Sequence, residues 1–193
     1  QAVGLKNQLP VAVDGQICSD FVGRKVTIRV QLGAAHDDAT RLARVHDNLE
    51  RLGLAAPTVR VVRGDAGEPR GWWDREPFHA ILLDAPCSAS GIVRRHPDIP
   101  WLRRPGDIDA LARAQARLLD ACLHMLAPGG CIVYTTCSIF RAEGQAQIDA
   151  LMQRHAQHAP ALDPASPGHL LPLPENDGDA ATHDGFFYAR LTT

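Results

Sequence analysis

Residues 78–88 have the sequence FHAILLDAPCS, a short apolar run that ends in an acid, a proline and a cysteine. The nearly unbroken run from Phe78 to Leu83 is typical of a strand that is covered on both faces of a parallel sheet. Ligands of open α/β sheets bind beyond the carboxyl ends of the strands. The stretch therefore predicts a buried strand that presents Asp84 and Cys87 at the ligand-binding edge of a sheet.

A long helix and a second strand follow this strand. Asp107 is a candidate cap for a helix whose apolar residues recur at three- and four-residue spacing as far as Leu126. The sequence Pro128-Gly129-Gly130 ends this helix, and Cys131 to Thr136 is the next strand candidate. Strand, helix and strand form a βαβ unit, whose right-handed crossover makes the two strands parallel.

The rest of the chain alternates in the same way. The remaining expected elements are a strand Val26–Val30, a helix from Asp37 or Asp38 to Gly53, a strand Thr58–Val62, a helix Glu143–His155, a loop over residues 160–184 and a strand Phe186–Leu191. Such alternation predicts an α/β fold, with a mainly parallel sheet and helices on both faces.

The composition restricts the class of protein. A length of 193 residues favours one domain, and a formal net charge of −2 means that any polyanion must be bound by a local basic patch. No apolar stretch approaches the roughly 18 residues of a membrane span, and the start lacks the order of a signal peptide. The sequence therefore predicts a cytoplasmic protein without a membrane segment.

The cysteines form an odd-numbered set without a C-x-x-C pair or metal-ligand spacing, namely Cys18, Cys87, Cys122, Cys131 and Cys137. This pattern argues against a disulfide framework and against a structural zinc site. Cys18, Cys122 and Cys131 are expected to be small buried hydrophobic residues.

Cys87 and Cys137 each follow a predicted strand, and one crossover would bring them to the same sheet edge beside Asp84. Two thiols and an acid suit the methylation of carbon 5 of a pyrimidine, because a thiolate that adds to carbon 6 makes carbon 5 nucleophilic. An acid that binds N3 and the amino group of the pyrimidine would stabilise the charge that develops on the ring. A dithiol redox pair is an alternative, and Asp84 could also be a simple turn former.

Several motifs around these cysteines resemble one known family. These motifs are Asp84–Ile99, Trp101–Arg104, Pro128–Gly130, Tyr134–Ser138, Glu143 and Asp184–Ala189. They resemble, in sequence and in order, motifs of the ribosomal small-subunit RNA cytosine-5 methyltransferases of the Sun/Fmu (RsmB) type. The resemblance covers roughly residues 36 to 191. It implies a Rossmann-like methyltransferase fold, S-adenosylmethionine as the methyl donor and ribosomal RNA as the substrate.

The resemblance also implies roles for individual residues. Cys137, in the Thr-Cys-Ser motif, would attack carbon 6, and Cys87, in the Pro-Cys-Ser motif, would assist release of the methylated product. Asp84 would hold the cytosine and border the methionine end of the donor. Asp65 matches an acid that contacts the donor's adenine, unless it only forms a turn. Asp38, with its neighbour Asp37, is a candidate for binding the donor's ribose hydroxyls.

The start of the chain departs from the family pattern. The family's glycine-rich Ala-Pro-Gly-Gly-Lys loop, which approaches the donor closely, has no match in residues 1–35. We therefore divide the chain into an atypical segment, residues 1–35, and a methyltransferase core, residues 36–193, as if the beginning were cut or replaced. The alternative to an active enzyme is a non-catalytic RNA-binding fragment that has lost the donor site.

A cluster of arginines follows the Pro-Cys-Ser motif. Between Arg94 and Arg117 six arginines outnumber three aspartates, and Trp101 lies among them. Arg94, Arg95, Arg103 and Arg104 would contact RNA, and Trp101 would stack on a base next to a flipped target. The alternative is a solvated helix face with Trp101 in the core.

Overall fold

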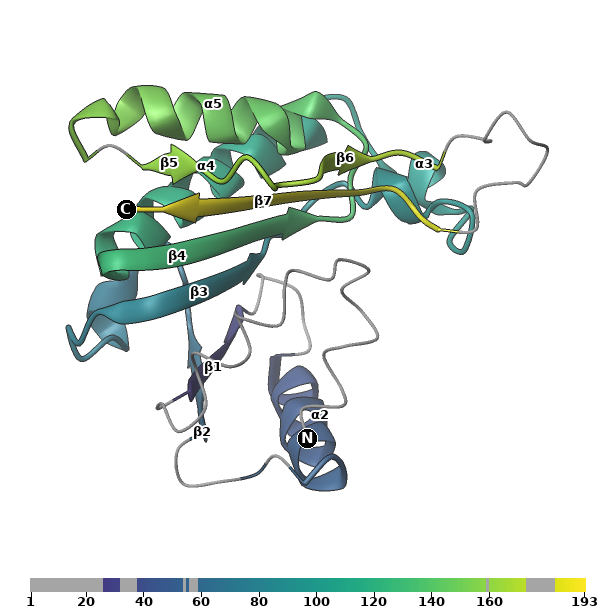
Figure 1. Ribbon diagram of the computed structural model, residues 1–193. Helices are drawn as coiled ribbons and strands as arrows, with labels where there is room; N and C mark the ends of the chain where they lie inside the picture. The colour runs from purple at the N-terminus through teal and green to yellow at the C-terminus, as the bar shows by residue number, and fades with distance from the viewer. Residues whose placement is uncertain (1–25, 32–37, 54, 56–58, 159, 173–182) are drawn as a thin grey trace. The chain divides into compact units, whose positions relative to one another are not determined.

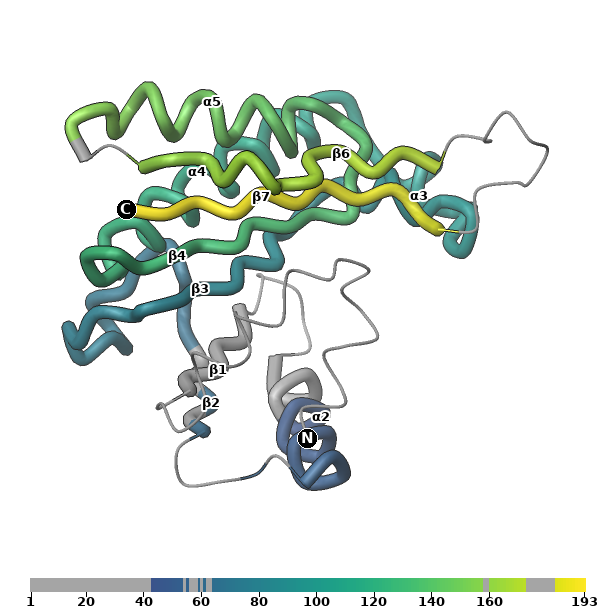
Figure 2. The backbone as a smooth tube through the Cα atoms, viewed as in Figure 1, coloured from purple at the N-terminus to yellow at the C-terminus, as the bar shows by residue number. Residues whose placement is uncertain are grey.

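The computed structural model describes residues 26–31, 38–53, 55, 59–158, 160–172 and 183–193, which fall into two compact units (Figures 1 and 2). The first unit runs to Asp65 and includes Arg70–Trp72, and the second contains Ala66–Pro69 and Trp73–Thr193. The predicted α/β class is confirmed. The predictions for Cys18, for Asp37 and for most of residues 1–35 lie outside the described residues.

The first unit contains a parallel pair of strands joined through a helix. Strand β1 (Val26–Gln31) pairs with β2 (Val59–Gly64), and helix α2 (Asp38–Arg51) lies between them in sequence. The helix ends before Gly53, whose φ of +65° suits glycine, as the sequence predicted. Because the strands are parallel, their carboxyl ends lie at the same edge of the pair.

The second unit is built on a five-stranded sheet, in which β3, β4 and β7 lie side by side (Figure 1). Its strands are β3 (Phe78–Asp84), β4 (Leu126–Thr136), β5 (Ala161–Leu162), β6 (Gly168–Leu170) and β7 (Phe186–Thr192). The pair β3 and β4 is parallel as predicted, whereas β7 is antiparallel to β4, β5 and β6. The sheet is therefore mixed. β5 and β6 lie in the stretch that the sequence predicted as loop.

Two boundaries differ from the prediction for local reasons. Strand β4 starts at Leu126, before the Pro-Gly-Gly sequence, and not at Cys131. Phe78 of β3 pairs with Leu126 and Ala80 pairs with Cys131, so the Pro-Gly-Gly sequence lies in an irregular part of the pairing between the two strands. The predicted helix from Glu143 divides into a 3₁₀ turn and α5, because Gly144 between them has a non-helical backbone.

The helices of the second unit differ widely in length. The 3₁₀ turns are η2 (Ser90–Ile92), η3 (Arg141–Glu143) and η4 (Ala156–His158). The α-helices are α3 (Ile99–Leu102), α4 (Asp107–Met125) and α5 (Gln145–Arg154). A further 3₁₀ turn, η1 (Pro69–Gly71), has residues in both units. Gly106 occupies the cap position of α4, which corrects the prediction for Asp107. The Asp107 carboxylate instead accepts the backbone N–H of Arg104 at 2.8 Å.

The core of the second unit forms where α4 and α5 pack on the sheet. Its fully buried side chains include Leu118, Leu119, Ile132, Tyr134, Ile148 and Leu151. Cys122 and Cys131 are also buried, which confirms their prediction as core residues. Apolar burial of this kind is the main force that holds the strand ends in place.

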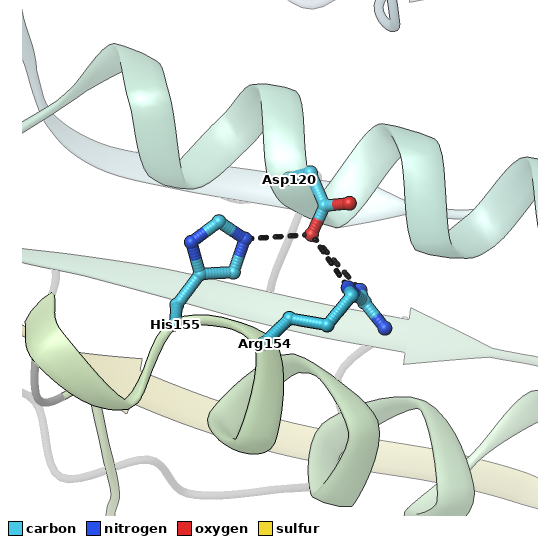
Figure 3. Close-up of polar contacts among 3 residues, drawn as sticks. All are labelled: Asp120, Arg154 and His155. Atoms are coloured by element: carbon cyan, nitrogen blue, oxygen red, sulfur yellow. Dashed lines mark hydrogen bonds and ion pairs between the residues drawn. The ribbon is translucent and has the colours of Figure 1, made fainter.

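A polar cluster lies between α4 and the carboxyl end of α5 (Figure 3). Asp120 of α4 accepts a hydrogen bond from Arg154 Nη2 at 2.9 Å, and His155 Nε2 lies 2.9 Å from the same oxygen. All three side chains are partly exposed, so the cluster contributes little to stability compared with the core.

Candidate active site

The structure brings the two predicted site cysteines together. Cys87 follows β3 and Cys137 follows β4, and their Sγ atoms lie 3.4 Å apart although the residues are 50 positions apart in sequence. Strands β3 and β4 are parallel and Asp84 pairs with Thr135, so the carboxyl ends of the two strands lie side by side at one edge of the sheet. Both thiols are free and half-buried, so this pair is neither a disulfide nor sealed inside the core.

Backbone hydrogen bonds fix the loops that carry these thiols. Gly91 N–H donates to the Cys137 carbonyl at 2.9 Å, and Gly185 N–H donates to the Gly91 carbonyl at 2.8 Å. A Cβ atom at Gly91 would collide with the Gly185 carbonyl oxygen, so no other residue fits between these segments. Three segments distant in sequence are thus held together around the two sulfurs.

The two thiols have different acidities. The pKa of Cys137 is lowered, because a hydrogen bond from the Cys87 thiol stabilises its thiolate more than burial opposes it. The pKa of Cys87 is raised, because its proton is held in that hydrogen bond and because the residue is half-buried. At a given pH, Cys137 therefore has the larger thiolate fraction of the two, and the thiolate is the reactive form of a cysteine.

Asp84 lies in a row of polar side chains across the sheet. The register places Asp84 of β3 beside Thr135 of β4, and Thr135 beside Tyr188 of β7. Partial enclosure at the strand edge raises the pKa of the Asp84 carboxyl, although its residue is exposed overall. Burial, above all, raises the pKa of Tyr188, and the charges of Asp84 and Cys137 add to this effect. Tyr188 was assigned no role from the sequence, although it lies in the motif Asp184–Ala189 that supports the family resemblance.

Of the three acids predicted at the donor site, Asp38 and Asp65 lie in the first unit and Asp84 lies in the second. Asp38 is the first residue of α2, and Asp65 directly follows β2. The carbonyl of Asp65 accepts a hydrogen bond from the Trp72 indole at 2.9 Å. Both acids therefore follow the carboxyl ends of one parallel strand pair, the edge at which nucleotides bind in α/β folds.

Two of the predicted RNA-binding arginines converge on one acid. Arg95 Nη2 lies 2.6 Å and Arg94 Nη2 3.6 Å from the carboxylate of Asp184, which is buried at the start of β7. The arginine side chains are 60% and 58% exposed for Arg94 and Arg95. Both guanidinium groups are therefore held beside Asp184, and more than half of each arginine side chain is accessible to solvent.

The segment around α3 lies next to the Cys87 loop. Arg103 Nε donates to the Ser88 carbonyl at 2.8 Å, whereas Arg104 is exposed. Trp101 is 88% exposed and Leu102 is 65% exposed, so the interpretation that places Trp101 in the core is wrong. An exposed indole on a segment that is hydrogen-bonded to the Cys87 loop is available for stacking.

One further residue was not assigned a role from the sequence. Glu143 is fully buried, and its carboxylate accepts hydrogen bonds from Ser88 and Ser138, the residues that follow the two cysteines. The sequence motifs marked Glu143 only as part of the resemblance. No periodicity could reveal that η3 turns its carboxylate towards both loops.

The described part of the chain contains neither a candidate membrane span nor a candidate metal-binding group. None of its helices combines the length and the apolar character needed to cross a membrane. The described residues also contain no group of three or more histidine, cysteine, aspartate or glutamate side chains that could hold a metal ion.

Comparison with known proteins gives matches over most of the chain. Residues 24–192 match the family model "16S rRNA methyltransferase RsmB/F". A Vibrio cholerae protein named ribosomal RNA small subunit methyltransferase B is 50% identical over 163 residues, which are 84% of this chain. The match covers only 36% of that protein, so the chain spans about a third of the relative's length.

Solved structures support the same fold. A crystal structure of PH0851 matches with a TM-score of 0.71 and 28% identity, over 86% of this chain and 37% of that one. The NSun6 structure from Pyrococcus horikoshii, solved with SFG, matches with a TM-score of 0.64 and 26% identity, over 86% of this chain and 41% of that one.

Proposed function

Because the chain belongs to the RsmB/F family of 16S rRNA methyltransferases, we propose that it forms the methyl-transfer core of an enzyme acting on small-subunit ribosomal RNA. We propose carbon 5 of a cytosine as the target atom. The observation that carries this proposal is the pair of sulfurs 3.4 Å apart, one of them with a lowered pKa, beside the acid of Asp84. The proposed substrate makes the cytoplasm the expected place of action.

Cys137 is the proposed nucleophile. Its thiolate adds to carbon 6 of the cytosine, a C–S bond forms, and the electrons of the 5,6 double bond make carbon 5 nucleophilic. Asp84 is the proposed partner of N3 and the amino group. Its raised pKa favours the sharing of a proton with N3, which stabilises the charge that develops on the ring.

Asp38 and Asp65 are the proposed residues for the methyl donor. Their position beyond the carboxyl ends of β1 and β2 suits the hydroxyl and amino groups of a nucleoside. S-adenosylmethionine supplies the methyl group when it is bound. Because residues 1–35 contain no glycine-rich loop, the proposed donor site depends on these two acids and on Asp84.

The donor hypothesis is tested by calorimetric titration of the chain with S-adenosylmethionine. We expect measurable heat of binding, weakened by Asp65→Ala, together with transfer of labelled methyl to cytosine carbon 5 of small-subunit ribosomal RNA. No heat and no competition at millimolar donor, combined with retained RNA binding, would instead support the non-catalytic RNA-binding fragment.

Trp101 is proposed to stack on an unpaired base of the RNA, with Arg94, Arg95, Arg103 and Arg104 contacting phosphates. Base stacking on an aromatic ring contributes about 1–3 kcal/mol, so Trp101→Ala should weaken RNA binding by about five- to a hundredfold. A filter-binding titration against single-stranded RNA measures this change. Trp101→Phe is the matched control and should retain most of the affinity. Because the side chain is 88% exposed, neither variant should alter the melting temperature.

A further inference from the structure

We propose that Glu143 is a positioning residue, which holds Cys87 and Cys137 in contact by binding the residue that follows each of them. The reaction that these thiols serve is the one proposed above, and the inference about Glu143 rests on it. The geometry of the two thiols can nevertheless be measured without that reaction.

The carboxylate of Glu143 joins the two cysteine loops through short hydrogen bonds. Its Oε2 atom accepts the hydroxyl of Ser88 and the hydroxyl of Ser138, both at 2.6 Å. Its Oε1 atom accepts the backbone N–H of Ser88 at 2.8 Å. One oxygen therefore fixes the distance between two loops that are 50 residues apart in sequence.

Other contacts hold Glu143 itself in place. Its carbonyl accepts the Tyr134 hydroxyl at 2.8 Å and the Thr136 hydroxyl at 3.3 Å, both from β4. Gln115 of α4 donates to Oε1 at 3.3 Å and to the carbonyl of Pro86, directly before Cys87, at 2.8 Å. The carboxylate thus extends from a backbone that is fixed to the strand leading into Cys137.

The burial of Glu143 indicates that its role is specific. The side chain is completely inaccessible, and a buried carboxylate is expensive unless its oxygens are hydrogen-bonded. Ser88, Ser138 and Gln115 supply these donors. An apolar side chain would fill the space at lower desolvation cost, but it could not bind either loop. Unlike an apolar side chain, the carboxylate therefore fixes the distance between the loop that contains Ser88 and the loop that contains Ser138.

Two effects of Glu143 on Cys137 have opposite signs, and this makes the inference testable. Its negative charge raises the pKa of Cys137, as the charge of Asp84 does, whereas the hydrogen bond from Cys87 lowers it and is the larger influence. If Glu143 keeps the thiols together, its loss removes that hydrogen bond and the pKa of Cys137 rises. If Glu143 acts only through its charge, the pKa falls.

The experiment compares the pH profile of Cys137 alkylation in the intact chain and in Glu143→Gln. Iodoacetamide labelling at each pH, resolved by peptide mass spectrometry, follows this cysteine separately from the others. We expect the profile of the variant to move to higher pH, with alkylation near neutral pH about tenfold slower. Cross-linking of Cys87 to Cys137 by dibromobimane should also decrease. A profile that is unchanged or that moves to lower pH would overturn the proposal.

Three further variants complete the design. Ser138→Ala removes one hydroxyl from the Glu143 carboxylate and keeps both thiols, so it should shift the profile in the same direction even if Glu143→Gln does not fold. Ser88→Ala tests the other loop in the same way. Asp120→Asn, which alters a carboxylate between α4 and α5 outside this site, should leave the profile unchanged. Alkylation requires neither donor nor RNA, so the result stands even if the proposed methyl transfer fails.

Discussion

Replacing Cys137 with alanine should abolish methyl transfer, with a rate loss on the order of a thousandfold or more. Carbon 5 of cytosine is a poor nucleophile until a thiolate adds to carbon 6, and Cys137 is the thiol whose pKa is lowered. Cys87 lies 3.4 Å away on a different loop, so its sulfur does not occupy the position from which Cys137 attacks, and burial still raises the pKa of Cys87 when Cys137 is absent. The measurement is incorporation of labelled methyl into ribosomal RNA.

Cys131→Ala is the matched control for this variant. Cys131 lies in the middle of the same strand, β4, where it is buried in the core, whereas Cys137 follows the end of the strand. Its loss should reduce stability by about 1 kcal/mol through lost packing and leave the methylation rate nearly unchanged. Methylation at a normal rate by the Cys137→Ala variant would exclude this cysteine as the nucleophile.

The part of the site that the sequence could predict depends on one topological rule. Phe78 to Leu83 and Cys131 to Thr136 have the apolar character of adjacent parallel strands, and a right-handed crossover aligns their carboxyl ends. That rule places Cys87 near Cys137, and the structure shows the two sulfurs in contact. The roles of these residues came from the family resemblance, not from the topology, and they remain proposals.

The part that could not be predicted depends on tertiary contacts without a sequence period. The direction of β7 follows from the path of the chain after α5, which returns through the short strands β5 and β6 instead of a helical crossover. The exposure of Trp101 likewise depends on what packs around α3. Spacing alone allows either a core or a surface position for such a residue.

The division of the chain also remains a prediction. The family model matches residues 24–192, so it includes part of the segment 1–35 that the sequence analysis set apart. Residues 1–35 were set apart because the family resemblance implies a glycine-rich loop that has no match there, and only glycine allows the backbone to approach a ligand so closely. The calorimetric titration with S-adenosylmethionine tests whether the donor binds without that loop.

Replacing Cys87 with alanine should have a different effect, accumulation of a covalent adduct between the chain and its RNA. Once Cys137 has bonded to carbon 6, it no longer carries the charge and the hydrogen bond that raise the pKa of Cys87. Cys87 then loses its proton more easily and can act in the steps that expel the product, because it still lies beside the adduct. Without this thiol, Cys137 still attacks, but the elimination that frees the enzyme becomes slow.

The adduct can be measured as a band of reduced mobility on a denaturing gel, in which protein and RNA signals coincide. We expect most of the Cys87→Ala variant to be shifted in the presence of RNA and donor, and little of the intact chain. The double variant Cys87→Ala/Cys137→Ala is the control, since the bond requires the Cys137 sulfur. A shifted band in the double variant would assign the bond to another residue. Normal turnover by Cys87→Ala would show that neither the attack by Cys137 nor the release of the product needs the neighbouring thiol, and it would overturn the role proposed for Cys87.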